Sequence, residues 1–142
     1  MFFFAEKFSR KNIVCLSGPT YFDGVSLFHR FFTYIFWWIA TFTIYQLTGY
    51  MGIFANLVVR SESLKKIGGI DTKVEFYGDD TNITRRLSKV GRVLFLRSFF
   101  VYASGRRFDK EGLVATTWRY GINFFSEAIV HKPVTKGYTE VR

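Results

Sequence analysis

The sequence predicts a single α/β domain, because short β-branched runs alternate with segments of helical periodicity along its 142 residues. Strand-like runs lie at 12–17, 92–96 and 98–103, and helical patterns lie between and after them. Hydrophobic residues make up 49% of the chain and aromatic residues 20%, a composition that excludes a disordered protein. A chain of this length can bury a core of its own.

The first predicted strand is the apolar run at 12–17, which Gly18 and Pro19 close with a turn. This run contains Cys15, the single cysteine of the chain, so an internal disulfide is excluded. No activating partner lies near this cysteine in the sequence. We therefore expect a buried, unreactive thiol.

A long aromatic segment follows, and no charged residue occurs between Arg30 and Arg60. Within it, residues 31–48 approach the length that a membrane-spanning helix needs. Composition leaves open a transmembrane helix, a helix lying in the membrane interface with Trp37 and Trp38 at headgroup depth, and a buried core helix. The net charge of +9 suits an anionic membrane, a phosphate-bearing substrate or nucleic acid, and the crowded Phe and Trp favour the membrane over nucleic acid.

Two shorter elements are expected next. Residues 53–59 form an apolar run that predicts a strand or an extended segment. Ser61 is a suitable N-cap for a short helix through Ile67, and Gly68 and Gly69 would end that helix.

Gly78 is followed by adjacent carboxylates, Asp79 and Asp80, at the start of another helical pattern. Asp80, Thr81 or Asn82 can each serve as the N-cap of that helix. Acidic residues at a helix start are commonly capping residues that favour the positive end of the helix dipole. In a partly dry cleft, the same carboxylates could act as a general base or bind a metal.

The same helix carries one apolar stripe, because Ile83, Leu87 and Val90 follow the helical period. Gly91 stands where a C-terminal cap belongs. Farther on, residues 110–130 predict another helix, and the polar tail at 132–142 is expected to be loose.

Basic pairs offer a second kind of candidate site. Arg106 and Arg107 lie on a glycine turn between a predicted strand and a predicted helix. They could be solvated charges, or their guanidinium groups could contact phosphate.

Several of these segments, taken in order, resemble the C-terminal half of a family 2 glycosyltransferase. The residues that carry the resemblance are Ala55-Asn56-Leu57-Val58-Val59-Arg60, Ile67-Gly68-Gly69-Ile70-Asp71, Tyr77-Gly78-Asp79-Asp80-Thr81-Asn82-Ile83-Thr84-Arg85-Arg86-Leu87, Gly91-Arg92-Val93 and Ser104-Gly105-Arg106-Arg107-Phe108. The likeness covers most of residues 12–125, and we assign 12–131 to that half of the domain.

The resemblance implies a partial Rossmann-like A-type glycosyltransferase fold, a mixed sheet flanked by helices, and inverting transfer of a sugar from a nucleotide-sugar donor to an acceptor hydroxyl. Asp80 matches the family's general base, and Asp79 matches the neighbouring Glu that shapes the acceptor pocket. Substrate-binding roles would then fall on Asn56, Gly78 and the pair Arg106 and Arg107.

The chain also departs from the family pattern. Asp79 replaces the usual Glu, Asn82 replaces the usual Asp, and the Gln-x-x-Arg-Trp motif of processive members is missing, which argues against polymer synthesis. No Asp-x-Asp motif occurs, so the metal ligands and the donor-binding half would precede residue 1. We therefore expect a fragment that binds nucleotide-sugar weakly alone, while the complete enzyme would use Mg2+ or Mn2+.

The family also suggests a setting for the aromatic segment, since the corresponding helix often faces the membrane beside the acceptor site. We expect a peripheral, interfacial protein on the cytoplasmic face of the membrane, acting on a lipid-linked or cell-envelope glycan acceptor. The alternative function is a small non-enzymatic membrane protein, with an aromatic helix and a basic region that binds lipid or a partner.

Overall fold

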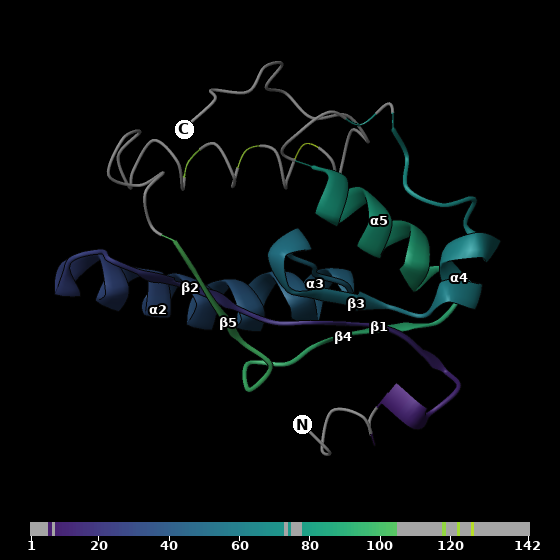
Figure 1. Ribbon diagram of the computed structural model, residues 1–142, viewed down its shortest axis with the longest axis horizontal. Coiled ribbons are helices and arrows are strands. Elements are labelled where there is room, and N and C mark those ends of the chain that lie inside the picture. The colour runs from purple at the N-terminus through teal and green to yellow at the C-terminus, as the bar shows by residue number, and fades with distance from the viewer. Residues whose placement is uncertain are drawn as a thin grey trace.

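The computed structural model describes residues 6, 8–72, 74, 78–104, 118, 122 and 126. Within this part, helices flank a mixed sheet, as Figure 1 shows, which confirms the α/β class. The elements in chain order are β1 (Ile13–Ser17), β2 (Thr20–Asp23), α2 (Leu27–Ala40), a π-helical turn (Thr41–Tyr45), α3 (Gln46–Thr48), a 3-10 turn (Phe54–Asn56), β3 (Leu57–Val59), α4 (Ser61–Lys66), α5 (Asp79–Ser88), β4 (Arg92–Phe95) and β5 (Val101–Ser104).

Strand β1 is the centre of a three-stranded sheet with the order β3-β1-β4. It pairs antiparallel with β3 and parallel with β4, and every one of its residues is buried. This burial on both faces explains why residues 13–16 are continuously apolar rather than alternating. The predicted strand and the buried Cys15 are both confirmed, and Cys15 is fully covered.

Strands β2 and β5 form a separate parallel pair that continues the direction of β1 and β4. The junction is held by backbone bonds, because Leu96 donates its amide to Ser17 (2.9 Å) and Val101 donates to Pro19 (3.1 Å). Gly18 lies so close to the turn before β5 that an added Cβ would stand 1.7 Å from the carbonyl oxygen of Phe99. Only glycine allows the two chains to approach at this point.

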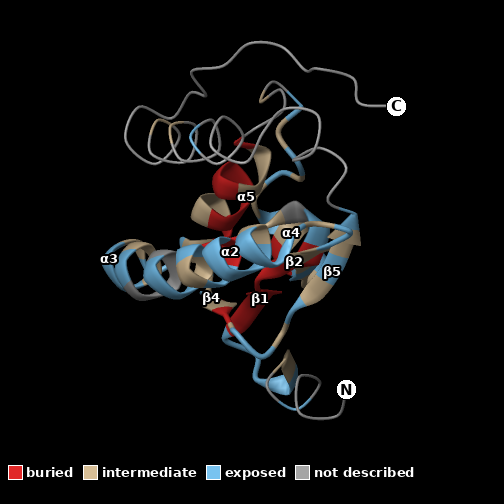
Figure 2. Ribbon diagram, turned by 90° about the vertical axis from the view of Figure 1, so that its left-hand side faces the viewer, coloured by how far each residue is buried: buried red, intermediate tan, exposed pale blue. Residues whose placement is uncertain are grey.

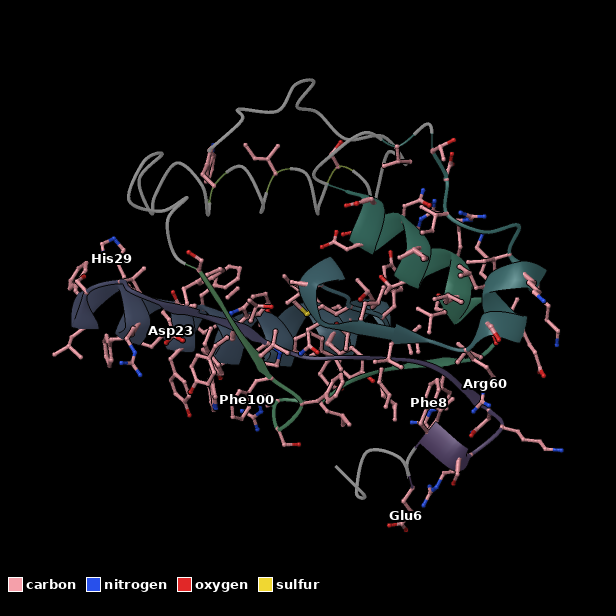
Figure 3. The ribbon with its side chains drawn as sticks, in the orientation of Figure 1. Glu6, Phe8, Asp23, His29, Arg60 and Phe100 are labelled. Carbon is pink, nitrogen blue, oxygen red and sulfur yellow. The ribbon has the colours of Figure 1, made fainter. Side chains whose placement is uncertain are left out.

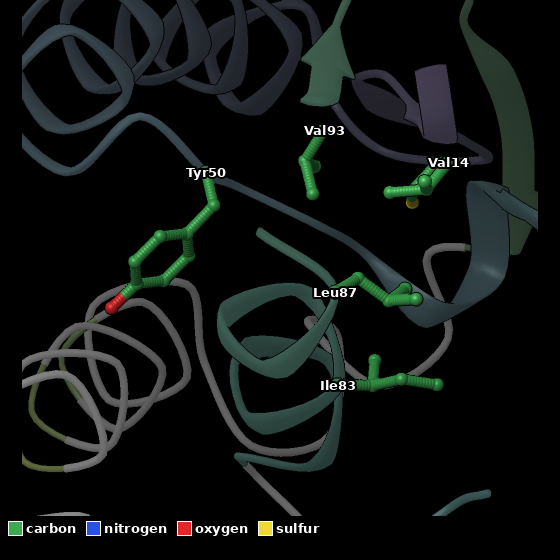
Figure 4. Close-up of a cluster of buried hydrophobic side chains, with 6 residues drawn as sticks. Val14, Tyr50, Ile83, Leu87 and Val93 are labelled. Atoms are coloured by element: carbon green, nitrogen blue, oxygen red, sulfur yellow. The ribbon is translucent and has the colours of Figure 1, made fainter. Parts of the chain in front are cut away.

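Helix α5 packs against β1 and β4 and supplies much of the core. Ile83 and Leu87 are buried with Val14, Tyr50 and Val93, as Figure 4 shows. The predicted stripe is therefore confirmed for its first two members. It is wrong for Val90, which lies beyond the last helical residue and is 41% exposed.

The beginning of α5 also differs from the expectation. The N-cap is Gly78, whose carbonyl accepts the amide of Asn82 (2.8 Å), so Asp79 and Asp80 are already helical. The expected caps, Asp80, Thr81 and Asn82, all lie inside the first turn. The glycine backbone suffices as a cap here because the two aspartates accept the free amides of that turn.

At the other end of α5, Gly91 is not the C-cap, a position that Lys89 occupies. Glycine is required at position 91 for a steric reason, since an added Cβ would lie 2.3 Å from Cγ1 of Val14 and 3.0 Å from the carbonyl oxygen of Asn12. Gly91 thus allows the turn into β4 to pass close to β1. Its amide still bonds to the carbonyl of Leu87 (3.1 Å).

The segment before α4 is less extended than expected. A 3-10 turn occupies Phe54–Asn56, and only Leu57–Val59 forms a strand. Ser61 is the first residue of α4 rather than its N-cap, which is Arg60. Gly68 and Gly69 follow the helix with φ of 78° and 79°, which confirms the predicted glycine ending.

The side chain of Arg60 joins this segment to the N-terminus. Its guanidinium group donates to the carbonyl of Phe8 (2.6 Å) and lies 4.7 Å from the centre of the Phe8 ring. Figure 3 shows both side chains at the lower edge of the molecule. A hydrogen bond to the carbonyl of Ile13 (3.3 Å) also ties Arg60 to β1.

The aromatic segment forms α2, the π-helical turn and α3 in succession. Two aromatic side chains attach it to the strands, because Trp37 donates to the carbonyl of Thr20 (2.9 Å) and Tyr45 donates to the carbonyl of Val93 (3.0 Å). Figure 2 shows that much of the remaining surface of α2 is exposed. A buried core helix is therefore not what this segment forms.

None of the described helices, including those within residues 31–48, is long and apolar enough to cross a membrane. The predicted helix at 110–130, the loose tail at 132–142, and Arg106 with Arg107 lie outside the described residues, apart from single positions at 118, 122 and 126.

The corrected face of α5 can be tested by stability measurements. We expect Leu87→Ala to lower the free energy of unfolding by about 2–5 kcal/mol, because it leaves a cavity in the core. The matched change Val90→Ala should cost about 0.5 kcal/mol or less, since that side chain is partly exposed. Urea unfolding measures both, and equal losses would contradict the observed boundary of the core.

Candidate functional site

The candidate carboxylates lie in the first turn of α5, where local hydrogen bonds fix their orientation. The amide of Asp80 donates to Oδ1 of Asp79 (3.0 Å), and the amide of Thr81 donates to Oδ1 of Asp80 (2.8 Å). The Thr81 hydroxyl also donates to the same Asp80 oxygen (3.4 Å). Each carboxylate therefore accepts one amide of the first turn through one oxygen, although neither residue is the N-cap that the sequence predicted.

The other carboxylate oxygens are not used in this way. Within the described part of the chain, no other residue donates a hydrogen bond to the second oxygen of Asp79 or of Asp80. Each side chain is half-buried. An oxygen with no protein donor remains free to accept a proton or a hydrogen bond from another molecule.

The first turn of α5 is supported from below by a close backbone contact. The hydroxyl of Thr84, which is fully buried, donates to the carbonyl of Asp80 (2.7 Å). An added Cβ on Gly52 would lie 2.3 Å from Cγ2 of Thr84 and 3.4 Å from the carbonyl oxygen of Asp80. Any side chain at position 52 would therefore push the first turn of α5, and Asp80 with it, away from the sheet.

The electrostatic setting changes the acidity of Asp80. Burial raises its pKa from the ordinary value of 3.8 to about 6, and the adjacent Asp79 carboxylate adds to the increase, while the hydrogen bonds from Thr81 act against it. A carboxyl group with this pKa is mostly ionised near neutral pH and more basic than an exposed aspartate. It is therefore suited to take a proton from a hydroxyl group.

Asn56, a predicted substrate-binding residue, has a structural role in this fold. It is buried, and its amide nitrogen donates to the carbonyl of Phe99 (2.6 Å). Its backbone carbonyl accepts the hydroxyl of Ser17 (2.9 Å). The side chain therefore holds the end of β1 against the turn before β5, and its substrate-binding role stays a prediction.

The other predicted site residues have different outcomes. Gly78 is buried and caps α5 through its carbonyl. Arg106 and Arg107 lie outside the described residues, so whether they approach Asp80 stays a prediction. Arg86, from the neighbouring basic pair on α5, donates to the carbonyl of Ile67 and so joins α5 to the end of α4.

The candidate site shows no metal cluster in the part of the chain that the structure describes: no three side chains of His, Cys, Asp or Glu gather there. His29 is at the beginning of α2, where its ring nitrogen lies 2.6 Å from the hydroxyl of Ser26. The expected divalent metal of the complete enzyme stays a prediction. Burial raises the pKa of Cys15 to about 12, which leaves its thiol protonated and unreactive.

Sequence reasoning missed a second feature, a hollow of about 390 Å³ between α2 and the β2–β5 pair. We call it the aromatic hollow, and its lining includes Tyr21, Leu27, Arg30, Phe31, Tyr34 and Tyr102. These residues come from β2 and α2, which are neighbours in the chain, and from β5, which is distant in the sequence. The one available signal was Arg30, the last charge before the uncharged segment.

No protein-family model, curated protein or solved structure is found to match this chain. What the fold and site define is an α/β protein in which a half-buried aspartate of raised pKa begins a helix on the central sheet. An aromatic helix with an exposed apolar surface lies on the β2–β5 side.

The acidity of Asp80 can be tested by titration. We expect its carboxyl carbon signal to titrate near pH 6, and we expect Asp79→Asn to lower that midpoint because a neighbouring negative charge is removed. Carbon-detected NMR measures the change, with Asp23→Asn, at an exposed position, as the control. A titration midpoint near pH 3.8 that does not change in Asp79→Asn would contradict the burial of Asp80 beside Asp79.

The same shift has a consequence for stability. Because the pKa of Asp80 is higher in the folded state, folding becomes less favourable as pH rises from about 4 to about 6. Asp80→Asn removes this loss and keeps an oxygen that can accept the Thr81 amide. The variant should gain up to about 3 kcal/mol over the parent above pH 6, and the gain should shrink below pH 4.

Proposed function

We propose that this chain is the acceptor side of a family 2 glycosyltransferase that transfers a sugar with inversion from a nucleotide-sugar to a hydroxyl group. The observation that carries the proposal is the Asp80 carboxyl, which is half-buried, has a pKa of about 6 and, within the described residues, has one oxygen to which no other residue donates. The order of family-like motifs around it supports the same function.

In the proposed reaction, Asp80 accepts the proton of the acceptor hydroxyl. The oxygen then attacks the anomeric carbon of the donor sugar, and the nucleoside diphosphate leaves from the opposite face, which inverts the configuration. Asp79 supports the base by raising its pKa and by shaping the acceptor side. The departing diphosphate needs cations, which a divalent metal or the arginines of 106–107 would supply in the complete enzyme.

The arrangement of the elements supports this proposal. A mixed sheet with α5 against β1 and β4 is compatible with the acceptor half of a Rossmann-like A-type glycosyltransferase fold. Gly52 and Thr84 hold the first turn of α5 at a defined height, as a positioned base requires. The partners of the complete enzyme would be a nucleotide-sugar, a hydroxyl acceptor that is lipid-linked or part of the cell envelope, and the cytoplasmic membrane surface.

A second candidate function comes from α2. Large apolar side chains are exposed along it, including Leu27 (82%), Phe28 (65%) and Phe31 (60%). Such a surface also fits a non-enzymatic membrane-associated protein that binds lipid or a partner. The glycosyltransferase needs the Asp80 carboxylate as a base, whereas the non-enzymatic membrane protein does not.

The catalytic role of Asp80 can be tested in the complete transferase that contains this chain. We expect Asp80→Asn to lower kcat by about 100-fold or more with little change in donor affinity, because the base is lost while the fold is kept. In the parent, kcat/KM should fall as pH drops below about 6, and Asp79→Asn should move this fall to lower pH.

Single-turnover assays with labelled donor would measure the chemical step, with Asp23→Asn as a control of equal charge change. Unchanged turnover in Asp80→Asn would leave the two aspartates as helix-capping residues. The non-enzymatic function would then be favoured.

A further inference from the structure

The aromatic hollow combines features that seldom occur together on a surface: one cation, several phenol groups and an apolar rim. Arg30 is the charged residue in its lining, and no acidic side chain of the described residues lines it. Leu27 and Phe31 line the hollow and are also largely exposed, so its opening lies between apolar side chains. A ligand that fits must therefore be anionic at one end and apolar at the other.

The polar groups of the aromatic hollow can bind phosphate oxygens. The ring of Tyr21 lies 6.4 Å from that of Tyr34 and 6.1 Å from that of Tyr102, so three tyrosine rings lie close to one another in the lining of the hollow. Within the described part of the chain, none of these hydroxyls makes a hydrogen bond, and Arg30 has no acidic partner. A guanidinium fork with nearby O–H donors matches the geometry of a phosphate group.

Neighbouring groups add positive charge and rigidity. Arg97 lies over the ring of Trp38 on α2, with its guanidinium carbon 5.9 Å from the ring centre. Its charge also acts on Tyr21, whose pKa is raised by burial and by Tyr34 and Tyr102 but lowered by Arg97. Phe100, labelled in Figure 3, meets Tyr21 edge-on at 5.6 Å and holds that ring in place.

We propose that the aromatic hollow binds the phosphate group of an anionic phospholipid, with Leu27, Phe28 and Phe31 contacting the acyl chains around it. A free phosphate ion would use Arg30 and the phenols but would leave the apolar rim in water. A lipid uses both parts, because its acyl chains cover the rim. The volume of about 390 Å³ is sufficient for a phosphate with its glycerol or small headgroup.

This inference deepens the membrane association suggested above and does not depend on Asp80. Loss of lipid binding would leave the proposed sugar transfer standing, and loss of Asp80 function would leave the lipid site standing. The two proposals are therefore tested by separate measurements, one of binding and one of chemistry.

The test is sedimentation of the full chain with vesicles of phosphatidylcholine, with and without phosphatidylglycerol. We expect binding that requires phosphatidylglycerol and that falls about fivefold in Arg30→Gln, the effect of one cation at a lipid surface. Arg92→Gln, an exposed arginine at the start of β4, is the control of equal charge change and should lose much less. Leu27→Ser (82% exposed) should also weaken binding, whereas Ile70→Ser, at another exposed apolar position on a loop (51%), should not.

Three outcomes would overturn the proposal. Equal losses in Arg30→Gln and Arg92→Gln would indicate diffuse attraction of a basic protein to an anionic surface. Equal binding to vesicles without phosphatidylglycerol would indicate adsorption of the apolar helix alone. Saturable binding of inorganic phosphate that needs Arg30, together with no binding to vesicles, would assign the hollow to a free phosphate ligand.

Discussion

The structure depends on the junction at the end of β1, where Ser17 and Gly18 bring distant segments together. The hydroxyl of Ser17 donates to the carbonyl of Asn56 and accepts the amide of Ile53 (3.0 Å), while its backbone carbonyl accepts the amide of Leu96. Gly18 then allows the turn before β5 to pass at contact distance. A side chain at either position that filled this space or removed the hydroxyl would separate β1 from its neighbours.

The candidate base is connected to this junction through the backbone. Ile53 bonds to Ser17, and the preceding residue, Gly52, lies directly under Thr84 and the carbonyl of Asp80. The position of the carboxyl is thus determined by the centre of the sheet rather than by the helix alone. Burial is the largest contribution to its raised pKa, and the Asp79 carboxylate is the next.

The aromatic helix differs from β1 and α5, because only a few of its side chains pack against the rest of the fold. Trp37 and Tyr45 donate hydrogen bonds to strand carbonyls, and Trp37 also stacks near Phe95 at 6.1 Å. Several other large apolar side chains of α2, including Leu27, Phe28 and Phe31, stay exposed at a cost in water. Within the described residues, this exposed apolar surface makes α2 a favourable place for an apolar partner to bind.

Local patterns in the sequence were enough for some features. The β-branched and apolar run within 12–17 predicted β1 and the burial of Cys15, and the helical period predicted the burial of Ile83 and Leu87. Gly68 and Gly69 indicated a helix end because their backbone conformation is costly for other residues. These features depend on residues that are close together in the chain. The sequence alone therefore determined them, and it also determined that Asp79 and Asp80 are adjacent.

Only the tertiary structure decided the raised pKa of Asp80, the steric roles of Gly18, Gly52 and Gly91, and the aromatic hollow, because each arises where segments remote in sequence meet.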